Sequence, residues 1–344
     1  MAPANIKINP IGLAICLVVV VCVCFYMFGL PMWFKKEQRV SMREIISASI
    51  DLAERGGRKV IEIKQKDKLD EKVKGKTQEG AKEMLTSGDM ESHRAIVYGF
   101  AKAFPGLKVI SEEHDLQPVN LAVIEDVNLN NEEVAEVVTS DQSLPISQLT
   151  VWIDPLDATQ EYTENLDEYV TTMVCVAVNG EPTIGVIHKP FSKETVWAWV
   201  GYGQSNSVKQ AERKQKASDD PKTIIMSRSH PGQVQEVVKN AFGEKTGIVP
   251  AGGAGYKTLE VIRGKADAYI HVTRIKKWDI CAGNAILGAI DGKMTTLKGD
   301  RIDYSGQYSP VVNDGLVASV YNHNDYLDKL KDVNLEELNA KKNS

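Results

Sequence analysis

Hydrophobic residues are concentrated in one unbroken run near the N-terminus, and elsewhere they recur with the spacing of helices and strands. No charged residue occurs from Ile8 to Phe34, and the 20 residues 11–30 are almost purely apolar. As a helix, at about 1.5 Å per residue, they would span the roughly 30 Å of a bilayer's hydrocarbon core. The run therefore predicts a transmembrane signal-anchor helix at 11–34, after a stub at 1–10. A buried core helix and a cleaved signal peptide are the alternatives, although the run lacks a small-x-small cleavage site.

After this run the pattern becomes helical. Ser41 has the context of an N-cap, with Glu44 completing a capping box, and Ile45, Ile46 and Ile50 fall on one side of the predicted helix. A second helical pattern covers 91–104, and a strand pattern follows at 107–110. The acidic, weakly periodic stretch 115–147 is typical of a surface insertion.

Strand patterns dominate the middle of the chain, and strands alternate with helices towards its end. Asn179-Gly180 predicts a hairpin turn between two of the strands. Strands are predicted at 151–153, 170–178, 183–188, 194–200, 223–226, 247–249, 266–272 and 316–320. Helices are predicted to begin at residues 231, 256 and 279. We expect an α/β (α+β) layered sandwich with an antiparallel-rich half at 35–205, a βαβ-like half at 206–335 and a polar tail at 336–344.

Charge and cysteine content exclude some classes of function. From Lys35 onward there are 40 basic and 46 acidic side chains, because only Lys7 precedes. This acidic balance makes nucleic acid an unsuitable partner, since duplex binding needs a basic face. Cys175 and Cys281 are the only cysteines outside the apolar run, which is too few for a disulfide framework or a cysteine zinc site.

Basic residues flank the apolar run unevenly. Lys35, Lys36, Arg39 and Arg43 follow it and only Lys7 precedes it, so the positive-inside bias favours a cytosolic catalytic part. The ending Lys341-Lys342-Asn-Ser resembles a dilysine retrieval signal, and no Asn-x-Ser/Thr sequon occurs to indicate a luminal side.

The segment Trp152-Ile-Asp154-Pro-Leu-Asp157-Ala-Thr159 is the most informative motif. A strand ends before Pro155, so the chain turns, and Asp154 and Asp157 can converge on a cation that also takes the Leu156 carbonyl. Thr159 would then lie near a water on that cation. The alternative is a polar turn with no ligand, because Asp and Pro are common turn residues.

Three other acidic residues occupy similar positions. Glu112 follows the strand at 107–110, Asp279 heads a helix, and Asp89 follows Gly88. Taken one at a time, Glu112 can be part of an acidic turn, Asp279 a helix N-cap and Asp89 a turn residue. Each pair of like charges about 4 Å apart costs roughly 4 kcal/mol at an effective dielectric constant of 20, so a cluster of all five carboxylates requires cations. Oxygen ligands without Cys or His select Mg²⁺, and several Mg²⁺ ions are typical of phosphoryl transfer.

Two further segments are suited to binding anions. Ser227-Arg-Ser-His230 ends a strand and opens a helix, and Gly252-Gly253-Ala-Gly255-Tyr-Lys257 places a cation in the first turn of another. Ordinary helix caps are the alternative for both.

The motifs Ser111-Glu-Glu113, Trp152-Ile-Asp-Pro-Leu-Asp-Ala-Thr159 and Trp278-Asp-Ile-Cys-Ala-Gly283 resemble the three signatures of the lithium-sensitive, Mg²⁺-dependent inositol monophosphatase-like phosphatases. The resemblance extends from Ser41 to about Tyr326 and is strongest to the bisphosphate nucleotidase branch, particularly its membrane-anchored Golgi form. It implies the sugar-phosphatase fold and hydrolysis of 3'-phosphoadenosine 5'-phosphate, a sulfotransferase by-product, to AMP and phosphate. Relatives often have Gly where this chain has Ala158.

The resemblance also implies roles for individual residues and for two or three Mg²⁺ ions. Glu112, Asp154 and the Leu156 carbonyl would hold the first ion, Asp154, Asp157 and Asp279 the second, and Asp89 and Glu112 would lie near a third. Asp89 and Thr159 would activate water. The substrate would be bound by Thr159, Ser227, His230, Gly253 and Lys257.

The family further implies a single-pass type II protein of the Golgi membrane with its catalytic part in the lumen, opposite to the charge bias. A homodimer is a candidate assembly. An inositol phosphate substrate, a non-catalytic anchored binding protein, and a purely structural role for the motifs are the competing hypotheses.

Overall fold

The computed structural model describes residues 9–28, 37–76, 82–115, 117–217, 220–228 and 234–331. Two compact units divide the chain, one at 1–39 and one at 40–344. All elements that carry the predicted site lie in the second unit.

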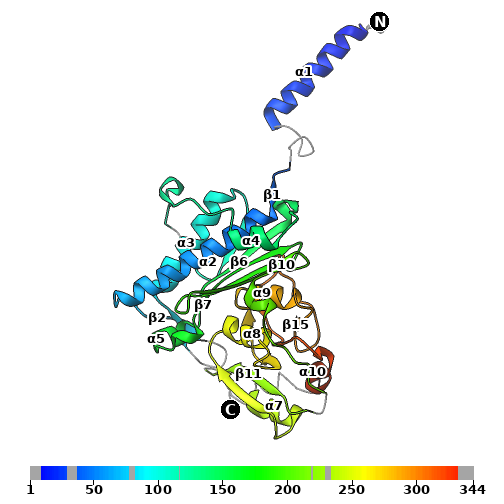
Figure 1. Cartoon of the computed structure of the whole chain (residues 1–344). Helices are drawn as coiled ribbons and strands as arrows, with labels where there is room; N and C mark the ends of the chain where they lie inside the picture. The colour runs from blue at the N-terminus through cyan, green and yellow to red at the C-terminus, as the bar shows by residue number, and fades with distance from the viewer. Residues whose placement is uncertain are drawn as a thin grey trace. The chain divides into compact units, whose positions relative to one another are not determined.

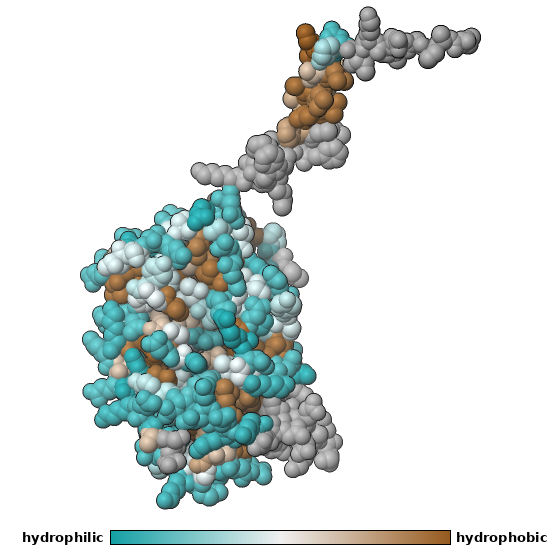
Figure 2. Space-filling view, turned by 90° about the vertical axis from the view of Figure 1, so that its right-hand side faces the viewer, coloured by the Kyte–Doolittle hydropathy of each residue, from teal (hydrophilic) through white to brown (hydrophobic). Residues whose placement is uncertain are grey.

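The first unit contains helix α1, Pro10–Phe28. Its surface is hydrophobic along the described part, where Ile11 and Val18 are 70% and 62% exposed (Figure 2). Among the described residues, however, no helix is both long enough and apolar enough to cross a membrane. The transmembrane helix predicted at 11–34 is thus without support here, and residues 29–34 of that prediction lie outside the described residues.

The second unit is built around a six-stranded sheet with helices on both faces (Figure 1). Neighbouring strands are antiparallel, except that β4 and β6 are parallel. Helices α2 (Met42–Gln65) and α3 (Ser87–Ala103) pack on one face, and α9 (Lys277–Gly288) packs on the other. The strands, in spatial order, are β10 (Gly203–Gln204), β9 (Glu194–Trp199), β8 (Glu181–Lys189), β7 (Thr171–Val178), β6 (Leu149–Asp157) and β4 (Lys108–Ser111).

A second sheet of five strands lies beyond α9 and α8 (Ala254–Ile262). Its outer face is covered by α7 (Val234–Phe242) and α10 (His323–Leu330), which share a buried cluster with it. The strands, in spatial order, are β12 (Gly247–Ala251), β11 (Thr223–Ser227), β13 (Ala268–His271), β17 (Leu316–Ser319) and β15 (Lys293–Thr295). Since β11, β12 and β13 are parallel, the predicted βαβ pattern is present, and helices and sheets alternate in layers as expected.

Several predicted local signals form as expected. The Ser41 side chain accepts a hydrogen bond from the Glu44 backbone N–H at 3.1 Å and so caps α2. Asn179 and Gly180 both adopt positive φ, at 50° and 85°, and connect β7 to β8 in the predicted hairpin. The pattern did not predict several short elements, among them β1 (Arg39–Ser41), β2 (Lys72–Lys76), β3 (Lys82–Leu85), β5 (Ser143–Pro145), β14 (Ile275–Lys276), β16 (Val311–Val312), α5 (Thr159–Thr163) and α6 (Asn206–Lys209).

The predicted surface insertion 115–147 is held closely against the six-stranded sheet's helical layer. It contains short helix α4 (Glu132–Val137), and Val134 and Val138 are fully buried in the cluster beneath α2. Arg43 on α2 donates to the Val138 carbonyl at 2.6 Å, and the Trp197 indole donates to Glu133 at 2.7 Å. These valines therefore attach the segment to the core, while most of its other described residues are exposed or partly exposed as expected of a surface insertion.

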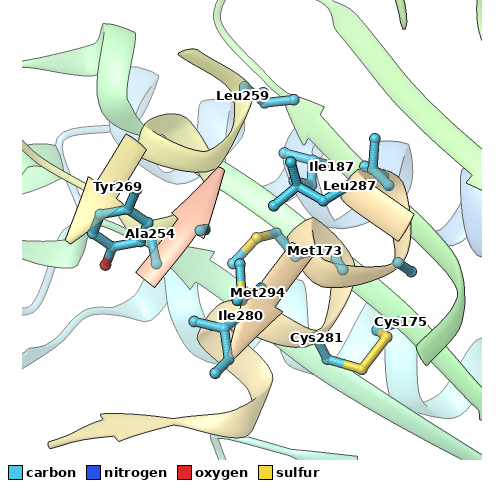
Figure 3. Packing of buried hydrophobic residues seen from close by; sticks show 14 of the residues in the cluster. Met173, Cys175, Ile187, Ala254, Leu259, Tyr269, Ile280, Cys281, Leu287 and Met294 are labelled. Carbon is cyan, nitrogen blue, oxygen red and sulfur yellow. A yellow bond between two sulfur atoms is a disulfide. The ribbon is translucent and has the colours of Figure 1, made fainter. Parts of the chain in front are cut away.

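Cys175 on β7 and Cys281 on α9 form a disulfide bond in the central cluster (Figure 3). They lie 106 residues apart in the chain and are 1% and 0% exposed. This bond was not predicted, because two isolated cysteines in a sequence reveal nothing about their distance in space.

Candidate metal centre and active site

Two acidic residues leave adjacent parallel strands at the same edge of the six-stranded sheet. Ser111 at the end of β4 pairs with Ile153 on β6, and the Glu112 backbone N–H donates to the Ile153 carbonyl at 3.1 Å. Asp154 follows Ile153 directly, so the register brings Glu112 and Asp154 side by side. The strand was predicted to end before Pro155, but β6 continues to Asp157. The missing N–H of Pro155 is accommodated by an irregularity in the pairing with β7 between Asp154 and Asp157.

Asp279 completes a three-carboxylate cluster. It lies in the first turn of α9, where its Oδ2 accepts a hydrogen bond from the Lys276 backbone N–H at 3.1 Å. One oxygen each from Glu112, Asp154 and Asp279 lies within 4.8 Å of the others. Burial raises the pKa of all three, and the neighbouring carboxylates raise it further. A cluster of this kind is suited to a divalent cation with oxygen ligands.

Asp157 lies at the same pocket but is already hydrogen-bonded to the start of α8. Its oxygens accept from the backbone N–H groups of Ala254 at 3.1 Å and Gly255 at 2.8 Å. Gly253 has a φ of +60°, and a Cβ there would lie 2.8 Å from Asp157 Oδ2. Only glycine fits this position without displacing the carboxylate.

Asp89, Thr159 and Leu156 form a connected group behind the cluster. Asp89 Oδ2 accepts from the Thr86 backbone N–H at 2.7 Å and lies 2.6 Å from the Thr86 hydroxyl. The Thr159 hydroxyl lies 3.0 Å from Asp89 Oδ1 and 3.1 Å from the Leu156 carbonyl oxygen. Burial raises the pKa of Asp89 to about 7, even though the Thr86 hydrogen bonds lower it. A carboxyl with this pKa can exchange a proton near neutral pH.

Lys74 is a site residue that the sequence analysis missed. Its ammonium lies 2.7 Å from Glu112 Oε1 and also contacts Glu113. The β2–β3 pairing is irregular between Val73 and Gly75, and a bulge of this kind redirects the side chain of the residue between them. The nearby carboxylates raise the pKa of Lys74 despite its partial burial, so it stays charged. No spacing in the sequence relates Lys74 to Glu112, because the hairpin's position is set by tertiary packing.

The predicted substrate residues line one open pocket with the acidic cluster. Its empty space, including the mouth, is about 930 Å³. Predicted residues on its walls are Glu112, Asp157, Thr159, Ser227, Gly253, Lys257 and Asp279. Lys257 is 4% exposed, donates to the Gly253 carbonyl and lies 5.2 Å from the centre of the Tyr269 ring. His230 lies outside the described residues.

Ala158 lies between the two halves of this site with φ 70° and ψ 45°. A left-handed conformation costs a residue with a Cβ about 1–2 kcal/mol. Glycine adopts this conformation without that cost, which agrees with the glycine expected here from the family resemblance.

Comparison with known proteins agrees with this geometry. Residues 41–333 match the inositol monophosphatase family. The chain is 48% identical over 317 residues to inositol monophosphatase 3 of Danio rerio, covering 89% of this chain and 91% of that protein. It is 44% identical over 363 residues to the Golgi-resident adenosine 3',5'-bisphosphate 3'-phosphatase of Homo sapiens, covering 97% and 98%.

Solved structures share the fold at low sequence identity. The extragenic suppressor protein suhB of Bartonella henselae aligns with a TM-score of 0.63 at 18% identity, covering 84% of this chain and 99% of that one. The Thermotoga maritima IMPase aligns with a TM-score of 0.61 at 21% identity, covering 84% and 97%. The sequence match, the layered fold and the clustered carboxylates together place the chain in the inositol monophosphatase family.

Proposed function

We propose that this protein is a Mg²⁺-dependent phosphatase that removes the 3'-phosphate of 3'-phosphoadenosine 5'-phosphate, giving AMP and inorganic phosphate. The observation that carries the proposal is the convergence of Glu112, Asp154 and Asp279 within 4.8 Å. The substrate is proposed from the activity in the name of the human relative, which is 44% identical over 97% of this chain.

The donor set fits Mg²⁺. All three clustered ligand groups are carboxylates, which favour a hard cation over zinc. The Lys74 ammonium lies 2.7 Å from Glu112 and supplies a positive charge beside the cluster, which supports the proposal that the carboxylates bind a cation here. Glu112, Asp154 and the Leu156 carbonyl would hold one ion, Asp154, Asp157 and Asp279 a second, and Asp89 and Glu112 would lie near a third. When bound, Mg²⁺ supplies Lewis-acid activation of a water nucleophile and neutralises charge on the phosphate.

Thr159 and Asp89 would move the proton of the attacking water. With the Thr159 hydrogen directed at Asp89 Oδ1, 3.0 Å away, the hydroxyl lone pairs are free to accept a hydrogen bond from water. A proton passing along this pair reaches a carboxylate whose pKa of about 7 suits acceptance near neutral pH. The Thr86 hydrogen bonds hold Asp89 in place for this step.

The substrate's second phosphate would be held at the opposite wall of the pocket. Ser227, Gly253 and Lys257 line it. The backbone N–H groups of Ala254 and Gly255 already donate to Asp157, so the Lys257 ammonium would supply the positive charge for the phosphate. His230 is proposed from the family resemblance alone. The pocket is open to solvent, which would give a nucleotide access to both the acidic cluster and Lys257.

Phosphate release from a substrate panel tests the proposal. The full chain in detergent is given 3'-phosphoadenosine 5'-phosphate, inositol 1-phosphate or AMP, with and without Mg²⁺. We expect Mg²⁺-dependent release from the first substrate, and none from the variant Asp154→Asn. Preference for inositol 1-phosphate, which the name of the 48% identical relative favours, would overturn the substrate assignment. No release from any substrate would favour an anchored binding protein instead.

We also propose that the protein lies in the Golgi membrane through its N-terminal segment, with the catalytic unit in the lumen. The human relative is named as a Golgi-resident protein and the apolar side chains of α1 are exposed, and both observations support this proposal. The Cys175–Cys281 disulfide supports a luminal catalytic unit, because disulfides persist in oxidising compartments. The excess of basic residues after the apolar run instead favours a cytosolic catalytic unit.

Alkaline carbonate extraction tests membrane anchoring, and protease protection of intact vesicles tests the orientation. The proposed homodimer is tested by light scattering.

A further inference from the structure

The disulfide joins α9, which carries Asp279, to β7, the strand that is paired with β6. Cys175 on β7 pairs in register with Trp152 on β6, two residues before Asp154. Its partner, Cys281, follows Asp279 by two residues on α9. The covalent bond therefore ties the helix that carries Asp279 to the strand next to the one that carries Asp154.

The helix and the sheet approach each other very closely at this bond. Gly185 on β8 pairs with Cys175, and a Cβ on Gly185 would lie 2.1 Å from the Ala282 carbonyl oxygen. Glycine thus allows the α9 backbone to lie directly on the sheet beside the disulfide. Figure 3 shows the bond in the same buried cluster as Met173, Ile280 and Leu287.

Apolar packing holds α9 on the sheet, but the hydrogen bond to the Asp279 carboxylate does not reach across to the sheet. Within the described residues it comes from the Lys276 backbone, at the same end of α9. Three carboxylates within 4.8 Å repel one another in the absence of a cation, and this repulsion acts to move α9 away from β6. The disulfide opposes that movement.

We propose that the Cys175–Cys281 bond is a positioning element of the metal site, which holds Asp279 near Asp154 and thereby raises the affinity for divalent cations. This inference rests on the metal site of the proposed function. It differs from a purely stabilising role, because a bond that only stabilises the fold leaves the cation affinity of the folded protein unchanged.

Binding of Mn²⁺ to the full chain in detergent, followed by electron paramagnetic resonance, tests the proposal. The double variant Cys175→Ala/Cys281→Ala should bind Mn²⁺ about tenfold more weakly, as for loss of a residue that orients a ligand. Val238→Ala, in the separate cluster beneath α7, is the matched control: it lowers stability and should leave the affinity unchanged. Equal affinity in the double variant and the wild type would overturn the positioning role.

A reciprocal measurement on the unmodified protein avoids any folding defect of the variant. Dithiothreitol donates two electrons and two protons to the Cys175–Cys281 bond, giving two thiols, and itself closes to a cyclic disulfide. If the bond tightens cation binding, the cation must make the bond harder to reduce by the same factor. Saturating Mn²⁺ should therefore shift the reduction equilibrium about tenfold, and no shift would overturn the proposal. Absence of Mn²⁺ binding by the wild type would instead refute the metal site itself.

Discussion

The substitution Asp154→Asn should have opposite effects on the stability of the metal-free protein and on its response to metal. Asp154 is 1% exposed and lies within 4.8 Å of ligand oxygens from both Glu112 and Asp279. At that distance and an effective dielectric constant of 20, each fully ionised pair costs roughly 3.5 kcal/mol. Because the pKa of all three carboxyls is raised, part of this repulsion is already relieved by proton uptake. We therefore expect the neutral amide to stabilise the metal-free protein by about 1–3 kcal/mol.

Thermal unfolding with and without Mg²⁺ measures both effects. A cation present at about 100 times its dissociation constant adds about 2.7 kcal/mol of stability. For a unit of roughly 300 residues, whose unfolding entropy is about 0.6 kcal/mol/K, this corresponds to roughly 4 °C. The wild type should show that rise, whereas Asp154→Asn should unfold a few degrees higher without metal and gain almost nothing from Mg²⁺. Glu136→Gln, an exposed carboxylate on α4, is the control and should behave like the wild type. A full Mg²⁺ response in Asp154→Asn, or a lower melting temperature without metal, would refute the reasoning.

Four further outcomes are expected. Thr159→Ala should lower turnover by roughly 10²–10⁴-fold with metal binding unchanged, measured by single-turnover phosphate release and Mn²⁺ titration; weakened Mn²⁺ binding would mean that Thr159 supports the metal instead. Lys257→Ala should raise the KM for 3'-phosphoadenosine 5'-phosphate, and an equal rise for substrates with one phosphate would contradict its role at the second phosphate. Lys74→Met should tighten Mn²⁺ binding severalfold by removing a competing cation, whereas weaker binding would show that Lys74 organises the ligands. Because the pKa of Asp89 is raised from 3.8 to about 7, its contribution favours folding below pH 4 and is lost as the pH rises towards 7. Asp89→Asn should flatten this part of the metal-free stability curve, and an unchanged curve would contradict the shift.

The sequence could predict the strand before Glu112 to within a residue, because the hydrophobic pattern is local information. It placed the end of the next strand before Pro155, whereas β6 continues to Asp157 through an irregular pairing with β7. The family resemblance, and not the spacing, selected which carboxylates belong together. The three-carboxylate cluster agrees with that selection for Glu112, Asp154 and Asp279.

Features that depend on long-range packing could not be predicted in the same way. The Lys74 contact with Glu112 needs the β2–β3 hairpin to lie over the site, and the Cys175–Cys281 bond needs α9 to lie directly on the sheet. The burial of Val134 in the acidic insertion also could not be predicted, because its short helix has too few apolar positions to show a helical period. In each case the physical cause is an interface between elements distant in sequence.

The most direct test of the metal centre is an anomalous difference map from crystals of the protein soaked with Mn²⁺. The account predicts at least one strong peak coordinated by the carboxylate oxygens of Glu112, Asp154 and Asp279, with the Lys74 ammonium displaced from Glu112. A map with no peak among these three side chains, at a Mn²⁺ concentration that supports phosphate release, would contradict it.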